Sequence, residues 1–180
     1  MAAYALFLRG INVGGNKLVP MADLRALIEK LGFTEVSTLL QSGNAVFRGP
    51  AQATPSLEMR FESAVAKRFG FESDCILRTA KEWTALMAEN PFPSEARSAP
   101  GHLLVVLLRE APRMGAVEAV RAAIKGPEQV GLVGRQLWAV YPVGQGTSKL
   151  TLPVIEKALG TRGTARNWNT VTKVAELLKD

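Results

Sequence analysis

The 180-residue sequence contains only one cysteine and one histidine. A single cysteine, Cys75, excludes an intramolecular disulfide and a cysteine-based zinc site. A histidine metal site or a Ser-His-Asp triad would have to include His102, and no matching motif surrounds that residue. We therefore expect no metal ion and no such triad. Cys75 lies in an apolar run and is predicted to be a small buried residue, and His102 is predicted to be structural or solvent-facing.

Long apolar runs are also missing. No segment approaches the ~18 apolar residues that a membrane-spanning helix needs. The N-terminus, Met1 to Tyr4, lacks the basic start of a signal peptide, and Arg9 interrupts the apolar run that follows. We therefore expect a cytoplasmic protein without a membrane partner.

The composition is that of a globular protein, with 47% hydrophobic and 21% charged residues. A chain of this length can bury about 70% of its unfolded surface and needs no disulfide or metal for stability. The net charge of +6 marks a basic protein and favours anionic partners, such as nucleic acid, phosphorylated metabolites or an acidic protein. The alternative is that a modest excess of scattered basic residues only keeps the protein soluble.

The first half of the chain predicts strands and helices in the order β-α-β-β-α-β. Short apolar runs predict the strands and apolar residues at helical spacing predict the helices, with glycine or proline at several of their ends. The predicted strands are 4–9, 36–41, 44–48 and 73–78, and the predicted helices are 21–31 and 57–65. Ser42 and Gly43 are typical of a two-residue hairpin. We assign residues 1–79 to one ferredoxin-like lobe.

The second half predicts the same order again. A helix at 81–89 and a proline-rich stretch form a connecting segment, residues 80–101. The predicted strands are 102–109, 129–133, 135–141 and 163–167, and the predicted helices are 114–124, 152–159 and 170–178. Residues 102–180 therefore form a second ferredoxin-like lobe with a C-terminal helix, and the fold class is α+β. A single continuous α/β sheet is the alternative.

A glycine-rich turn stands between the first strand and the first helix. It contains three glycines, two amides and two cations, and such turns can expose backbone N–H groups to an anion. A right-handed crossover makes the second strand parallel to the first, so the hairpin near residue 42 lies at the same end of the lobe. This first cluster of candidate ligand-binding residues is Arg9, Asn12, Gly14, Gly15, Lys17, Gln41, Ser42 and Asn44. It offers many donors and no carboxylate.

A second polar cluster is predicted in the second lobe. The third strand and the last strand of that lobe end at the same side, so the segments that follow them meet there. The candidate ligand-binding residues of this cluster are Ser148, Lys149, Arg166, Asn167, Trp168 and Asn169. If the two lobes face each other at these ends, one cleft would hold both clusters.

Each feature also has a structural explanation. The glycines can simply allow positive φ, the amides can satisfy turn backbone, and Asn169 or Thr170 can cap the last helix. Trp168 can be a core residue rather than a surface on which a nucleic-acid base stacks, and the core role is favoured.

Known motifs do not fit either loop. Gly10 and Gly15 have P-loop spacing, but the lysine comes two positions after Gly15 and Leu18 replaces the magnesium-binding hydroxyl. Gly144-Gln145-Gly146 leads to Lys149 where a dinucleotide fingerprint has its third glycine. No paired carboxylates accompany either loop, so we expect no cofactor and no metal-dependent phosphoryl transfer.

Three segments resemble an uncharacterised, mainly bacterial family called domain of unknown function 1697. They are Leu8 to Gly15 with Pro20 to Leu24, Gln41 to Asn44, and Thr164 to Val171. The resemblance implies a cytosolic α/β protein with duplicated ferredoxin-like lobes. It implies no activity.

The leading functional hypothesis is a non-catalytic module that binds a phosphate-bearing ligand, either a nucleotide or short single-stranded nucleic acid. The first alternative is an enzyme acting on a small anionic substrate, with Lys17 or Lys149 as the acid–base group. The second is a protein-interaction module or homodimer that pairs through exposed sheet edges.

Overall fold

The computed structural model describes residues 1–179. The N-terminal elements are β1 (Ala2–Leu8), α1 (Met21–Lys30), β2 (Thr34–Leu39), β3 (Asn44–Gly49), α2 (Thr54–Phe69), β4 (Cys75–Thr79) and α3 (Ala80–Ala88). The C-terminal elements are α4 (Pro93–Ser98), the 3₁₀ turn η1 (Pro100–His102), β5 (Leu103–Leu108), α5 (Ala116–Ala123), β6 (Gln129–Val133), β7 (Gln136–Val140), α6 (Leu152–Leu159), β8 (Gly163–Asn167) and α7 (Trp168–Lys179). Within residues 1–179, no helix has both the length and the apolar character needed to cross a membrane.

The strands form two four-stranded sheets, with the orders β2-β3-β1-β4 and β6-β7-β5-β8. Neighbouring strands are antiparallel throughout both sheets. This order is that of the ferredoxin-like βαββαβ unit, so the predicted α+β class with two tandem units is confirmed, and a single continuous sheet is not formed.

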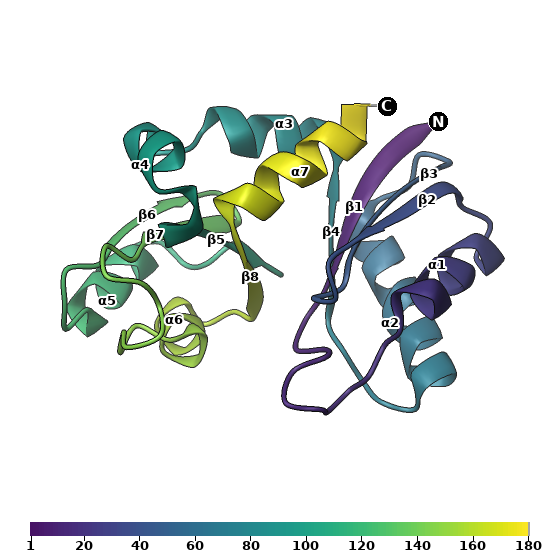
Figure 1. Ribbon diagram of the computed structural model, residues 1–180, viewed down its shortest axis with the longest axis horizontal. Helices are drawn as coiled ribbons and strands as arrows, with labels where there is room; N and C mark the ends of the chain where they lie inside the picture. Colours follow the sequence, from purple (N-terminus) through teal and green to yellow (C-terminus); the bar gives the residue numbers. More distant parts are fainter. Residues whose placement is uncertain (180) are drawn as a thin grey trace. The chain divides into compact units, whose positions relative to one another are not determined.

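By spatial proximity the described chain divides into two compact units. Unit 1 holds residues 1–85 and the end of α7 from Val174, and unit 2 holds Leu86–Lys173. In unit 1, α1 and α2 lie together on one face of the sheet, and in unit 2, α5 and α6 do the same (Figure 1).

Strand β1, in the interior of the unit 1 sheet, is buried on both faces, which explains its unbroken apolar sequence. Leu6 and its alternate neighbours face α1 and α2, where they join a core that includes Phe47 and Phe61. Phe7 points to the opposite face and stacks on Trp83 of α3, with 5.1 Å between the ring centroids. Strand β5 of unit 2 is buried along its whole length in the same way.

The outer edge of β4 is closed by side chains rather than left for another strand. Every second N–H along this edge donates to a glutamate of a packed helix. The pairs are Cys75 N–H to Glu62 at 3.0 Å, Leu77 N–H to Glu58 at 2.9 Å, and Thr79 N–H to Glu82 at 2.7 Å. The buried Arg78 guanidinium donates to the Leu77 carbonyl at 2.9 Å.

The opposite edge, β2, is interrupted by a bulge. Its register shifts between Thr34 and Ser37, and Glu35 within that stretch has a positive φ of 52°. The Glu35 carboxylate accepts a hydrogen bond from Arg48 of β3 at 2.7 Å. A bulge twists an edge strand and disrupts its row of donors and acceptors.

The two units repeat each other in detail. Leu8 pairs with Cys75 in unit 1, and Leu108 pairs with Gly163 in unit 2. Aligning these pairs places Arg166 at the position of Arg78. Arg166 is also buried and also donates to the preceding carbonyl, at 2.8 Å. In both units the last strand runs directly into a helix.

Several predicted boundaries differ from the structure. The turn between β2 and β3 spans residues 40–43 rather than two residues, because Leu40 has a φ of 61° and leaves the strand. Helix α4 and the 3₁₀ turn occupy part of the stretch that was predicted as a linker. Cys75 is buried as predicted, and His102 is exposed.

Candidate functional site

The glycine-rich segment of unit 1 forms a small projecting hairpin. Gly14 and Gly15 have φ values of 59° and 76°, and Asn16 N–H donates to the Val13 carbonyl at 3.1 Å. Positive φ at both central residues of such a turn is what glycine allows without strain. Within residues 1–179 the N–H groups of Gly14 and Gly15 make no hydrogen bond, and both residues are exposed.

Asn12 fastens this hairpin to the rest of unit 1. Its Nδ2 donates to the Val19 carbonyl at 3.0 Å and to the Gln41 carbonyl at 2.6 Å, and its Oδ1 accepts from Val19 N–H at 2.8 Å. The Asn12 backbone has a φ of 54°, a region that asparagine enters more readily than most residues. The side chain therefore holds the hairpin against the 40–43 turn.

The 40–43 turn lies beside the hairpin, as the predicted topology requires. Leu8 N–H donates to the Gly43 carbonyl at 3.0 Å. Gly43 has no room for a side chain, because an added Cβ would lie 2.6 Å from Ile11 Cδ1. Asn44 is buried and donates to the Leu39 carbonyl and to Ser42 Oγ, at 2.7 and 2.9 Å. The structure thus brings the whole first cluster to one end of unit 1.

The two cations of this end are held by the segment before β4. Lys17 Nζ donates to the Glu72 carbonyl at 2.7 Å and lies 5.9 Å from the centre of the Phe71 ring. An ammonium group has three donors, so this bond leaves donors that face solvent. Arg9 Nη1 lies 3.9 Å from an Asp74 carboxylate oxygen, and its side chain is 33% exposed.

Asp74 corrects one prediction about this cluster. The cluster was expected to contain no carboxylate, but Asp74 stands beside Arg9 because β4 pairs with β1 and delivers residue 74 to the same end. The local field is therefore less positive than the residues of the two predicted segments indicate.

Three large apolar residues are exposed at the same end of unit 1. Val13, Leu18 and Leu40 have 68%, 63% and 53% of their surface accessible. Val13 and Leu18 belong to the hairpin segment, and Leu40 belongs to the turn that Asn12 holds against it. Exposed apolar groups clustered at a polar loop are typical of contact surfaces.

In unit 2, the loop that precedes α6 is organised around a carboxylate that sequence reasoning missed. Ser148 Oγ donates to Glu128 Oε1 at 2.5 Å and accepts from Leu150 N–H at 3.1 Å. The hydrogen bond from Ser148 lowers the pKa of Glu128 from its ordinary value of 4.5. Burial, with a smaller contribution from Glu128, raises the pKa of Tyr141 to about 12.

The remaining residues of the second cluster divide into buried and exposed groups. Arg166 is buried, donates to Thr164 Oγ1 at 2.6 Å, and has its pKa lowered to about 10 by that burial. Trp168 is 8% exposed, which matches the alternative of a core residue. Asn167 Oδ1 accepts from Thr170 N–H at 3.0 Å and so caps α7, which begins at Trp168; the cap was expected two or three residues later, at Asn169 or Thr170. Lys149 and Asn169 are exposed.

No group of three or more histidine, cysteine, aspartate or glutamate side chains within residues 1–179 is arranged to hold a metal ion. The polar groups of both loops are mainly donors, which suit an anion better than a cation. The two clusters belong to different units.

The fold and the loops define a class of protein: a tandem of two ferredoxin-like α+β units, the first carrying a projecting glycine hairpin. The family model described as "Protein of unknown function (DUF1697)" matches residues 1–138. The chain therefore belongs to this family. The matched part includes the glycine hairpin and the 40–43 turn, and it ends before Arg166.

A solved structure extends the likeness over nearly the whole chain. The conserved bacterial protein SP0830 from Streptococcus pneumoniae is 23% identical, with a TM-score of 0.76, covering 98% of this chain and 98% of that one. This likeness is one of fold. A search of curated proteins finds no match.

Proposed function

We propose that the hairpin end of unit 1 binds a phosphate-bearing ligand, either a nucleotide or short single-stranded nucleic acid. The observation that carries the proposal is the exposed Gly14–Gly15 turn, whose N–H groups have no partner within residues 1–179. Backbone N–H groups at a glycine turn form an anion-binding concavity. Lys17 and Arg9 flank this turn and can add charge-assisted hydrogen bonds to phosphate oxygens.

Rigidity supports the same proposal. Asn12 holds the hairpin through three hydrogen bonds, so the turn is already shaped before a ligand arrives. A preorganised site binds more tightly because less conformational freedom is lost on binding. In unit 2, the exposed side chains of Lys149 and Asn169 are the members of the second cluster that can meet solvent-borne phosphate.

Salt dependence tests the proposal. We expect short fluorescein-labelled single-stranded RNA to bind at low KCl, with log affinity falling linearly as log KCl rises. Replacing Lys17 by glutamine removes one phosphate contact, so the magnitude of that slope falls by about 1. Fluorescence anisotropy across a KCl series measures the affinity and its salt dependence. The same measurement with labelled DNA and with a fluorescent nucleotide shows which class of ligand binds.

The matched control is Lys81→Gln, an exposed lysine of α3 in the same unit. It changes the net charge equally but lies outside the cluster. Equal loss of slope in Lys17→Gln and Lys81→Gln would refute a local site and leave only general attraction to a basic protein. Absence of binding at low salt, or binding that ignores salt, would refute the proposal outright.

A protein partner at the same end is the second candidate. Exposed Val13, Leu18 and Leu40 favour it, because a phosphate site gains little from apolar neighbours. Sedimentation that shows a strict monomer would exclude the homodimer form of this candidate.

A further inference from the structure

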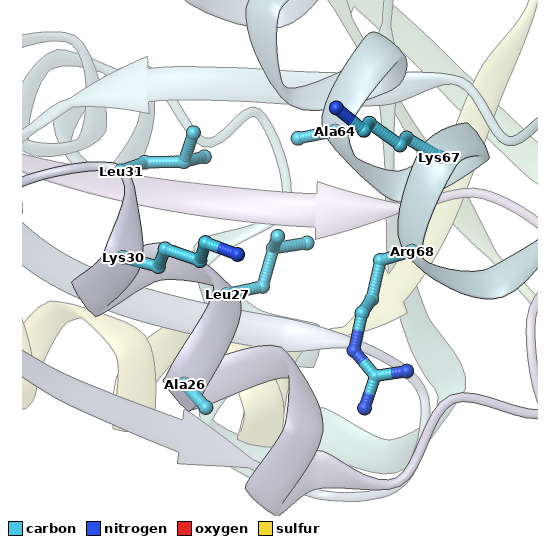
Figure 2. A pocket seen from close by; sticks show the side chains of 7 residues that line it. All are labelled: Ala26, Leu27, Lys30, Leu31, Ala64, Lys67 and Arg68. Atoms are coloured by element: carbon cyan, nitrogen blue, oxygen red, sulfur yellow. The ribbon is translucent and has the colours of Figure 1, made fainter.

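A groove lies between α1 and α2 of unit 1, and Figure 2 shows the side chains that line it. Its volume is about 460 Å³, and it is lined by Ala26, Leu27, Lys30, Leu31, Ala64, Lys67 and Arg68. The helices run in opposite directions, because Arg68 at the end of α2 pairs with Asp23 at the start of α1 at 3.5 Å. Arg60, nearer the start of α2, donates to the Leu31 carbonyl at 2.7 Å.

The floor of the groove is apolar. Leu27 comes from α1, Leu31 directly follows the end of α1, and Ala64 comes from α2 on the facing side (Figure 2). Ala26 is exposed on α1. Small residues allow another helix to approach closely, and the leucines give its apolar side chains a surface to contact.

The rim of the groove is positively charged. Lys30, Lys67 and Arg68 are all exposed, and no carboxylate lines the groove. Asp23 lies at one end and is occupied by Arg68. An apolar floor between rows of cations is complementary to a surface with an apolar stripe and flanking negative charges.

We propose that this groove binds an acidic amphipathic helix of a partner protein. Such a helix presents apolar residues at i, i+3, i+4 and i+7 to the floor, and carboxylates beside that stripe to Lys30 and Lys67. The apolar floor disfavours a nucleic-acid backbone, whose phosphates would meet leucine and alanine there.

A second copy of this chain does not supply such an acidic helix. Within residues 1–179, the one helix with two carboxylates four positions apart is α2, and its Glu58 and Glu62 are bonded to β4. The other described helices each lack such a pair. The occupant is therefore a different protein.

Fluorescence anisotropy with the full-length chain tests the proposal directly. The probe is a labelled synthetic helical peptide with leucines at i, i+3, i+4 and i+7 and glutamates beside them. A matched peptide has glutamine in place of each glutamate. We expect the acidic peptide to bind at least about fivefold more tightly, since several exposed ion pairs are lost in the matched peptide.

Variants locate the binding surface. The double variant Lys30→Glu with Lys67→Glu should weaken acidic-peptide binding roughly tenfold, because it replaces attraction by repulsion. Ala26→Glu should weaken it as well, because it narrows the groove and adds a negative charge on a helix surface that tolerates glutamate. The control Lys81→Glu lies on α3 and should leave the affinity within about twofold.

Four binding results would overturn the proposal. They are equal affinity for the two peptides, no binding of either, unchanged affinity in the double variant, or single-stranded RNA that displaces the peptide from the groove. A dimer in sedimentation that Ala26→Glu dissociates would assign the groove to a second copy and would also overturn it. The proposal does not rest on the phosphate site, so Lys17→Gln should leave peptide affinity unchanged.

Discussion

Replacing Asn12 by alanine is expected to loosen the glycine hairpin and to destabilise unit 1. The substitution removes three hydrogen bonds, two to Val19 and one to Gln41. An intramolecular hydrogen bond contributes about 1 kcal/mol net. The bond to Gln41 is exposed and partly replaced by water, so we expect a loss of about 2 kcal/mol from the bonds. Alanine is also less favourable than asparagine at a φ of 54°, which adds up to ~1 kcal/mol.

Two measurements check this expectation. Urea unfolding followed by tryptophan fluorescence reports on unit 1 through Trp83, which stacks on Phe7, and on unit 2 through Trp138 and Trp168. Hydrogen exchange at the Val19 amide reports on the hairpin itself, because that amide donates to Asn12 Oδ1. We expect the Val19 amide to lose most of its protection in the alanine variant.

Two further variants test which atoms of the Asn12 side chain contribute to stability. Asn12→Asp keeps the acceptor for Val19 N–H but places a carboxylate oxygen against the Val19 and Gln41 carbonyls, so its loss should be at least as large as that of alanine. Asn16→Ala is the matched control, since this exposed asparagine makes no side-chain hydrogen bond within residues 1–179, and its effect should stay within about 0.5 kcal/mol. Wild-type stability of Asn12→Ala, with the Val19 amide still protected, would refute the claim that Asn12 holds the hairpin.

Two predictions concern unit 2. Gly131→Ala should lower the free energy of unfolding in urea by ~1–3 kcal/mol, because the new Cβ would lie 2.9 Å from the Pro91 ring. The control Gly146→Ala places its Cβ in open space and should be near neutral. Equal effects of the two substitutions would contradict the close packing of Gly131 on Pro91. Ser148→Ala should raise the pKa of Glu128 toward 4.5, which carbon-detected NMR titration measures. A carboxyl with a lowered folded-state pKa stabilises the fold above its unfolded pKa, so that part of the stability difference between wild type and Ser148→Ala should disappear as the pH falls through the folded-state pKa. A stability difference that is entirely independent of pH would count against a link between the Ser148 hydrogen bond and the ionisation of Glu128.

Much of the fold could be predicted because local patterns and topology agreed. Unbroken apolar runs marked β1 and β5, and glycine or proline marked several element ends. The handedness of crossovers then placed the 40–43 turn beside the glycine hairpin, which the Asn12 to Gln41 bond confirms. Helix α4 was not predicted, because a proline-rich stretch indicates a linker, but Pro93 stands in the first turn of this helix, where proline is well accepted.

The surroundings of the candidate residues could not be predicted in the same way. Asp74 and the Glu72 carbonyl reach Arg9 and Lys17 only after β4 has paired with β1, far along the chain. Glu128 reaches Ser148 through a similar long-range approach. Whether a polar side chain faces solvent or the interior also depends on docking, so the burial of Arg166 follows from what covers its face of β8 and not from its neighbours in sequence.

The closed edges of the unit 1 sheet decide how this unit can associate with other molecules. Strand addition needs a row of available N–H and C=O groups, but glutamates occupy that row on β4 and a bulge interrupts it on β2. Pairing of another strand with the unit 1 sheet, which tolerates almost any sequence, is thereby disfavoured. Recognition by unit 1 then falls to its helices and loops, including the exposed backbone N–H groups of the Gly14–Gly15 turn, rather than to strand addition. A sheet protected in this way can change partners during evolution without becoming prone to aggregate.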